Sequence, residues 1–164
     1  MTRSAIRELV FKLLFRVEFQ DISDMENQAE YFVDEYIEKY IQDKNIGNTE
    51  GDQDAEDSKD AELLNGVNVS MDEVKKRAND VISLLPDIDK TISDNMTGWT
   101  IDRVGKIELT ILRLATYEIV HDENVPSSVA INEAVELAKK YGQSDSPSFI
   151  NGVLGKIVKK IESI

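Results

Sequence analysis

The chain has 164 residues, of which 41% are hydrophobic, and its formal net charge is −13. This length favours a single domain with one hydrophobic core. The absence of cysteine excludes disulfides and thiolate metal sites, and the one histidine is too few for a histidine-rich metal centre. No apolar run approaches the roughly 20 residues that span a bilayer. We therefore expect a cytoplasmic protein that needs no metal or other cofactor.

The negative charge is concentrated in one part of the chain. Residues 1–20 contain four basic and two acidic side chains, whereas residues 21–70 contain 15 acidic and three basic ones. Residues 71–164 are closer to balance, with 15 acidic and 12 basic side chains. The net charge therefore describes one segment more than the whole surface, and it does not exclude a nucleic-acid partner.

In the first half, apolar residues recur at three- and four-residue spacing, which predicts helices. One helix is predicted from about Arg3 to Phe19 and a second from about Met25 to Ile41. Residues 43–68 are rich in acids and poor in apolar side chains, so we expect a mobile loop there. Ser70 and Glu73 have the spacing of a capping box, and the next helix is expected to begin at this point.

In the second half, Pro86 is expected to end or kink that helix. A central helix is predicted from Ile101 to Val120, because apolar residues cover more than half of its circumference. The last two helices are expected to begin at Pro126–Ser128 and at Ser146, where Ser146 would be the cap and Pro147 would occupy the first turn. No convincing strand pair is present. The sequence thus predicts an all-α, compact single-domain bundle of about six to seven helices.

Amides and glycines occupy unusual places in the last two predicted helices. Asn132 and Asn151 lie near apolar stripes, where amides commonly satisfy backbone groups. Gly152 and Gly155 interrupt the final stripe, and we expect them to permit the close approach of another helix.

The first predicted helix carries basic and aromatic residues on one flank. With successive residues about 100° apart, Arg3 and Arg7 lie at the edge of the apolar stripe and Phe11 and Phe15 lie beyond them. Guanidinium groups bind phosphates and aromatic rings stack on unpaired bases, so this flank is a candidate site for single-stranded RNA. Alternatively, the two phenylalanines pack on a second helix.

Motifs of catalysis are missing from the sequence. It contains no GxxxxGK[ST] loop, no HExxH and no GxGxxG. His121 stands in the polar run HDEN, where an exposed or helix-terminal histidine is the expected outcome. We therefore do not expect an enzyme.

Three blocks of the second half resemble the NusB family of transcription antitermination factors, and the opening residues Arg3, Arg7, Glu8, Leu13, Leu14 and Phe15 resemble its N-terminal motif more loosely. The blocks are ILRLATYEI (Ile111–Ile119), VPSSVAINEAVELAKKYG (Val125–Gly142) and SFINGVLGKI (Ser148–Ile157). The resemblance implies an all-helical fold that binds boxA-type single-stranded RNA together with the ribosomal protein NusE. It further implies that this assembly acts with the transcription elongation complex and helps RNA polymerase resist termination, notably in ribosomal RNA synthesis.

The same resemblance points to residues of the second half. Glu108, Arg113 and Tyr117 match family positions near the RNA- and partner-binding surfaces, and Asp145 and Phe149 match a region beside the RNA path. Arg113 and Tyr117 could instead fix helix packing, and Phe149 could belong to the core. The candidates for RNA binding are thus Arg3, Arg7, Phe11, Phe15, Arg113 and Phe149, and those for partner binding are Glu108, Tyr117 and Asp145.

Two functions remain open at this stage. One is an RNA-binding adaptor that holds boxA-like RNA and docks NusE. The other is a helical protein–protein scaffold or homodimer with little RNA affinity of its own, which is consistent with the net acidity.

Overall fold

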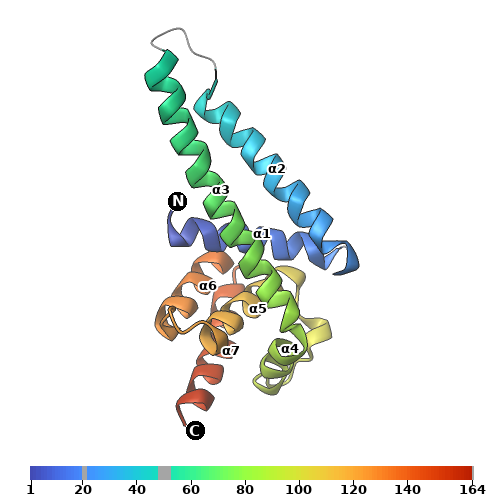
Figure 1. Cartoon of the computed structure of the whole chain (residues 1–164). Helices are drawn as coiled ribbons and strands as arrows, with labels where there is room; N and C mark the ends of the chain where they lie inside the picture. Colours follow the sequence, from blue (N-terminus) through green and yellow to red (C-terminus); the bar gives the residue numbers. More distant parts are fainter. Residues whose placement is uncertain (20–21, 48–52, 164) are drawn as a thin grey trace. The chain divides into compact units, whose positions relative to one another are not determined.

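A computed structural model gives the structure of the protein and describes residues 1–19, 22–47 and 53–163. In this part of the chain all regular secondary structure is helical (Figure 1), with seven α-helices and two short 3-10 helices. The all-α prediction is confirmed. The chain divides into two compact units, Met1–Arg77 and Ala78–Ile164, and the single-domain organisation stays a prediction.

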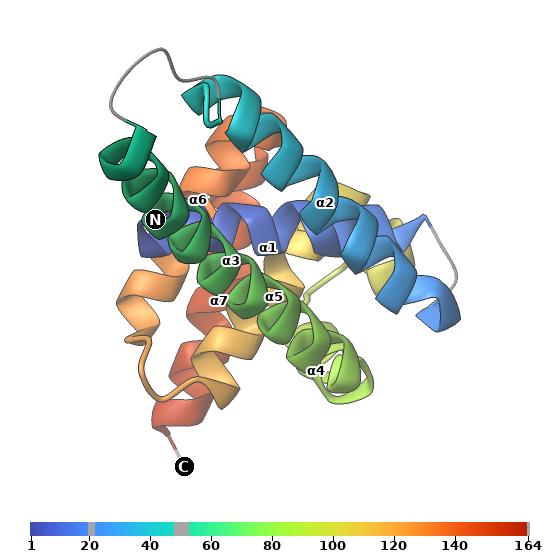
Figure 2. The ribbon, with the colours of Figure 1, turned by 45° about the horizontal axis from the view of Figure 1, so that its top comes forward.

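The first unit contains α1 (Arg3–Glu18), η1 (Ile22–Asp24), α2 (Met25–Lys44) and most of α3 (Gln53–Ser83). The side chain of Thr2 caps α1, because its Oγ1 accepts a hydrogen bond from the Ala5 N–H at 3.1 Å. In both views α2 and α3 lie side by side (Figures 1 and 2), and Lys75 of α3 forms an ion pair with Glu30 of α2 at 3.1 Å.

The acidic segment 43–68 differs from its prediction. We expected a loop, but α2 continues to Lys44 and α3 already begins at Gln53, while residues 48–52 lie outside the described residues. A buried apolar side chain occurs before the expected helix start, since Val67 is 5% exposed, and Met71, directly after Ser70, is 1% exposed. The alanines, glutamates and leucines of this segment are good helix formers, and Ser70 therefore lies inside α3 and does not cap a helix.

The second unit contains the end of α3, α4 (Leu85–Asp94), η2 (Ile101–Arg103), α5 (Lys106–His121), α6 (Ser127–Tyr141) and α7 (Ser146–Glu162). Pro86 lies in the first turn of α4, where its missing N–H leaves no helical hydrogen bond unmade. The helix α5 packs against α4, α6 and α7, and α6 packs on α7. The predicted central helix is confirmed, although it begins at Lys106, after η2. Among the described helices, none combines the length and apolar composition that crossing a bilayer requires.

Two buried threonines of α5 provide a test of this packing. Thr110 donates a hydrogen bond from Oγ1 to the Lys106 carbonyl oxygen at 2.7 Å, whereas the Oγ1 of Thr116 has no hydrogen-bond partner in the described structure. Both side chains are almost completely buried. Thr116→Val removes an unsatisfied hydroxyl without changing shape, and we expect it to raise the free energy of unfolding by about 1 kcal/mol. Thr110→Val should lower it by about 1 kcal/mol, and urea denaturation that shows both variants destabilised would contradict this assignment.

Candidate nucleic-acid interface

Phe11 and Phe15 of α1 and its C-cap residue Phe19 form a row with about one ring per helical turn. The ring centroids of Phe11 and Phe15 are 6.3 Å apart, and those of Phe15 and Phe19 are 5.0 Å apart in an edge-to-face arrangement. Phe11 is 3% exposed and Phe19 is 62% exposed, with Phe15 between these extremes. The burial of Phe11 supports the packing alternative for its ring, and a contact of Phe11 with a base stays a prediction. Phe19, which is not among the predicted site residues, is the exposed end of this row of rings.

The cations of α1 differ in their access to solvent. Arg3 is exposed, whereas Arg7, one turn later, is 9% exposed. Lys12 lies 4.0 Å from Glu8, and Arg16 lies 3.1 Å from Glu35 of α2. Exposed pairs of this kind contribute at most about 1 kcal/mol each, so a phosphate can replace the carboxylate partner. Arg3, Lys12 and Arg16 are therefore the basic groups of α1 that a polyanion reaches most directly.

A hollow of about 240 Å³ lies in the second unit, and three of the predicted site residues line it: Glu108, Asp145 and Phe149. Its lining consists of Trp99, Arg103, Val104, Gly105, Glu108, Gln143, Asp145, Ser146 and Phe149. Trp99 is 57% exposed, and its ring lies edge-on to that of Phe149 at a centroid distance of 6.4 Å. The exposed ring of Trp99 and the half-buried ring of Phe149, in one hollow with Arg103, are suited to a base and a phosphate.

Trp99 and Arg103 were missed by the sequence analysis. The signal was available, since Trp99 stands in a polar stretch outside every apolar stripe. A tryptophan in such a place does not belong to the buried face of a predicted helix. Only the fold, however, brings it beside Phe149, which lies 50 residues further along the chain.

A hydrogen-bond network holds one wall of the hollow. Ser146 donates from Oγ to Glu108 Oε1 at 2.6 Å and accepts from the Gln143 N–H at 2.9 Å. Glu108 lies in the first turn of α5, with its carboxylate against Gly105, where the helix dipole favours a negative charge. Ser146 is thus not the cap that we predicted; Asp145, which is exposed, occupies the N-cap position of α7.

Arg113 and Tyr117 do not line this hollow and are engaged in packing. The guanidinium of Arg113 donates from Nε to Asp89 Oδ1 at 2.8 Å and from Nη2 to Asp89 Oδ2 at 2.9 Å, which ties α5 to α4. The hydroxyl of Tyr117 donates to Asp80 Oδ2 at 3.3 Å, and its ring stacks on His121. Both observations support the packing alternative for these side chains.

The architecture can now be compared with known proteins. The NusB family model matches residues 4–159. The chain belongs to the NusB family. A transcription antitermination protein NusB of Agathobacter rectalis is 39% identical over 156 residues, which cover 95% of this chain and 98% of that relative. Membership places the chain among transcription antitermination factors, a non-enzymatic regulatory family.

Solved NusB structures share the fold. The T. maritima NusB structure has a TM-score of 0.72 and 29% identity, with 98% of this chain and 92% of that chain covered. A chain in a crystal structure of the antitermination factors NusB and NusE in complex with dsRNA has a TM-score of 0.64 and 25% identity, with 96% of both chains covered.

Proposed function

We propose that this NusB-family protein binds a boxA-type single-stranded RNA together with the ribosomal protein NusE and so helps the cytoplasmic elongation complex resist termination, notably in ribosomal RNA transcription. The observation that carries the RNA and NusE parts of the proposal is the likeness to a chain from the NusB–NusE–dsRNA crystal structure over 96% of both chains. The exposed basic and aromatic groups described above supply the chemistry.

Each unit offers its own RNA-binding groups. In the first unit, Arg3 presents an exposed guanidinium at the start of α1. In the second unit, Trp99 and Phe149 provide rings and Arg103 a cation within one hollow. Rings that stack on bases require those bases to be unpaired, which favours single-stranded RNA over a duplex.

The acidic groups of the hollow suit a role in selection or docking. Glu108 and Asp145 repel phosphates, but their carboxylates can accept hydrogen bonds from the amino groups of bases or from a basic partner protein. Asp145 is exposed at the start of α7, and we propose it as the NusE contact. Glu108 would support such a contact through Ser146, to which it is hydrogen-bonded. Tyr117 lies outside the hollow lining and is hydrogen-bonded to Asp80, and its role in NusE binding stays a prediction.

A salt titration tests RNA binding. If two to four phosphates are neutralised, log K should fall against log salt with a slope of roughly −1.5 to −3. Arg3→Ala should reduce the steepness by about 0.7, because one phosphate contact is lost. Its melting temperature should not change, because the side chain is exposed. Lys139→Ala, which removes an exposed cation of α6 that pairs with Glu136, is the matched control and should leave the slope unchanged.

Two results would count against the adaptor function. Absence of RNA binding with NusE present would reject it, and equal affinity for a duplex of the same sequence would reject the single-stranded specificity. The acidity of residues 21–70 favours a second candidate, a protein–protein scaffold or homodimer. That function predicts NusE binding or a concentration-dependent dimer in sedimentation, with no measurable affinity for RNA.

A further inference from the structure

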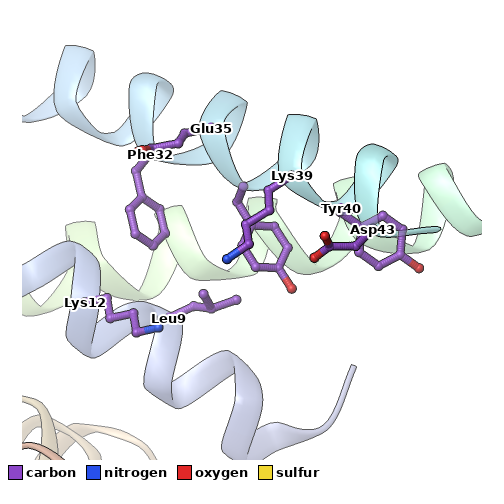
Figure 3. Close-up of a pocket in the computed structure, with 8 residues that line it drawn as sticks. Leu9, Lys12, Phe32, Glu35, Lys39, Tyr40 and Asp43 are labelled. Atoms are coloured by element: carbon purple, nitrogen blue, oxygen red, sulfur yellow. The ribbon is translucent and has the colours of Figure 1, made fainter. Parts of the chain in front are cut away.

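A groove of about 370 Å³ lies between α1 and α2 in the first unit (Figure 3), and neither the family resemblance nor the proposed RNA contacts include it. It is lined by Leu9, Lys12, Phe32, Glu35, Tyr36, Lys39, Tyr40 and Asp43. Leu9 is 8% exposed and belongs to the core beneath the groove.

One wall of the groove is aromatic. Phe32, Tyr36 and Tyr40 follow one another at four-residue spacing on α2, so each ring lies about 6 Å further along the helix axis. All three side chains are half-buried, which leaves part of each ring open to a ligand. Burial, with a smaller effect of Tyr40, raises the pKa of Tyr36. Its hydroxyl is therefore protonated at neutral pH and can donate a hydrogen bond.

Two lysines line the same groove as these rings. Lys12 comes from α1 and Lys39 from α2, and Figure 3 shows both side chains in the space between the two helices. The carboxylate of Glu35 is held by Arg16 at 3.1 Å, which lowers its repulsion of an anion. Asp43 lies beside Tyr40 at the other end of the groove (Figure 3). The stretch around Phe32, Tyr36 and the two lysines is consequently the part suited to a phosphate.

We propose that this groove holds one or two unstacked nucleotides of single-stranded RNA, with bases on the rings of α2 and phosphates on Lys12 and Lys39. The inference rests on the proposed function and extends the RNA contact along α1. Lys12 is nine residues beyond Arg3, or about 14 Å along the helix, a distance that a few nucleotides span. An acidic peptide would satisfy the lysines alone, whereas RNA also uses the flat faces of the aromatic wall.

The test compares two RNAs, a boxA-type core and the same core extended by a few nucleotides. Tyr40→Leu retains an apolar side chain but removes the ring, and it should weaken binding of the extended RNA by about fivefold or more, the effect of one lost stacked base. Lys39→Ala changes an exposed residue and should reduce the steepness of the salt dependence for the extended RNA by about 0.7. Lys44→Ala, in the last turn of the same helix but outside the groove lining, should change neither.

The outcomes separate this inference from the proposed function. Failure of both RNAs to bind the wild-type protein rejects both proposals. If both RNAs bind and Arg3→Ala weakens both, while Lys39→Ala and Tyr40→Leu change neither, only the groove assignment is overturned. It is also overturned if these two variants lose NusE binding and keep their RNA affinity, because the groove would then be a protein-docking site. Thermal melting of each variant verifies that it is folded.

Discussion

Gly142→Ala is expected to lower the free energy of unfolding by about 2–3 kcal/mol, the range of overpacking in a closely fitted site. A Cβ at this position would lie 2.7 Å from the Cβ of Ser146 and 2.8 Å from the carbonyl oxygen of Ala138. Ser146 cannot move freely, because it is hydrogen-bonded to Glu108 and Gln143. The backbone of Gly142 itself is in an ordinary extended conformation, so the requirement for glycine here is purely steric.

Gly152→Ala is the matched control for this prediction. A Cβ at Gly152 would meet no atom within 4 Å, and the residue lies exposed in the interior of α7. Alanine is the better helix former, and we expect an increase in stability of about 0.5–1 kcal/mol. Guanidinium denaturation measures both variants. A similar loss of stability in each would show that the steric argument for Gly142 is wrong.

The same two variants also test whether the hollow of the second unit binds RNA. Gln143, Asp145 and Ser146 line that hollow, and a shift forced by a methyl group at position 142 would move these residues. If the hollow binds RNA, Gly142→Ala should weaken RNA binding at temperatures where the variant is still folded. Gly152→Ala should leave the affinity unchanged.

The open space at Gly152 also corrects an expectation from the sequence. Within the described residues, no other helix comes close to Gly152 or Gly155, since a Cβ at either position would meet nothing within 4 Å. Periodicity locates an interruption in an apolar stripe but does not give the distance to a neighbouring element. The glycine that does permit a close contact, Gly142, stands at a helix end and looks in the sequence like an ordinary C-terminal glycine.

Helices with a clear apolar stripe were predictable and the start of α3 was not. The apolar stripe of α1 contains six residues that the structure buries, among them Val10 and Leu13. By contrast, the first turns of α3 contain few apolar residues, and composition favoured a loop there. A helix is favoured instead by the helix propensity of these residues. It is also favoured by the burial of Val67 and Met71 in the fold.

The candidate site was only partly predictable for a similar reason. Helical geometry predicts that Arg3, Arg7 and Phe11 share one flank of α1, but it could not show that Phe11 is buried while Arg3 is exposed. Burial depends on contacts distant in sequence. The hollow formed by Trp99 and Phe149 depends on such contacts entirely.

Arg113→Ala is expected to lower the free energy of unfolding by about 2–3 kcal/mol, because it leaves Asp89 without a bidentate partner in a partly buried place. The side chain of Arg113 is 16% exposed and that of Asp89 is 31% exposed, so solvent screens the pair only in part. Asp89→Ala should have a comparable effect. The double variant should lose less than the sum of the two, with a coupling energy of about 1 kcal/mol or more.

The variant Arg113→Lys and a measurement of RNA binding distinguish a packing role of Arg113 from an RNA contact. Arg113→Lys keeps the charge but not the two parallel hydrogen bonds, and we expect it to restore only part of the lost stability. If Arg113 acts through packing, the folded Arg113→Ala variant should bind RNA within about twofold of the wild type, a difference of roughly 0.4 kcal/mol. Wild-type stability together with a large loss of RNA affinity would instead mean that the guanidinium leaves Asp89 to bind a phosphate.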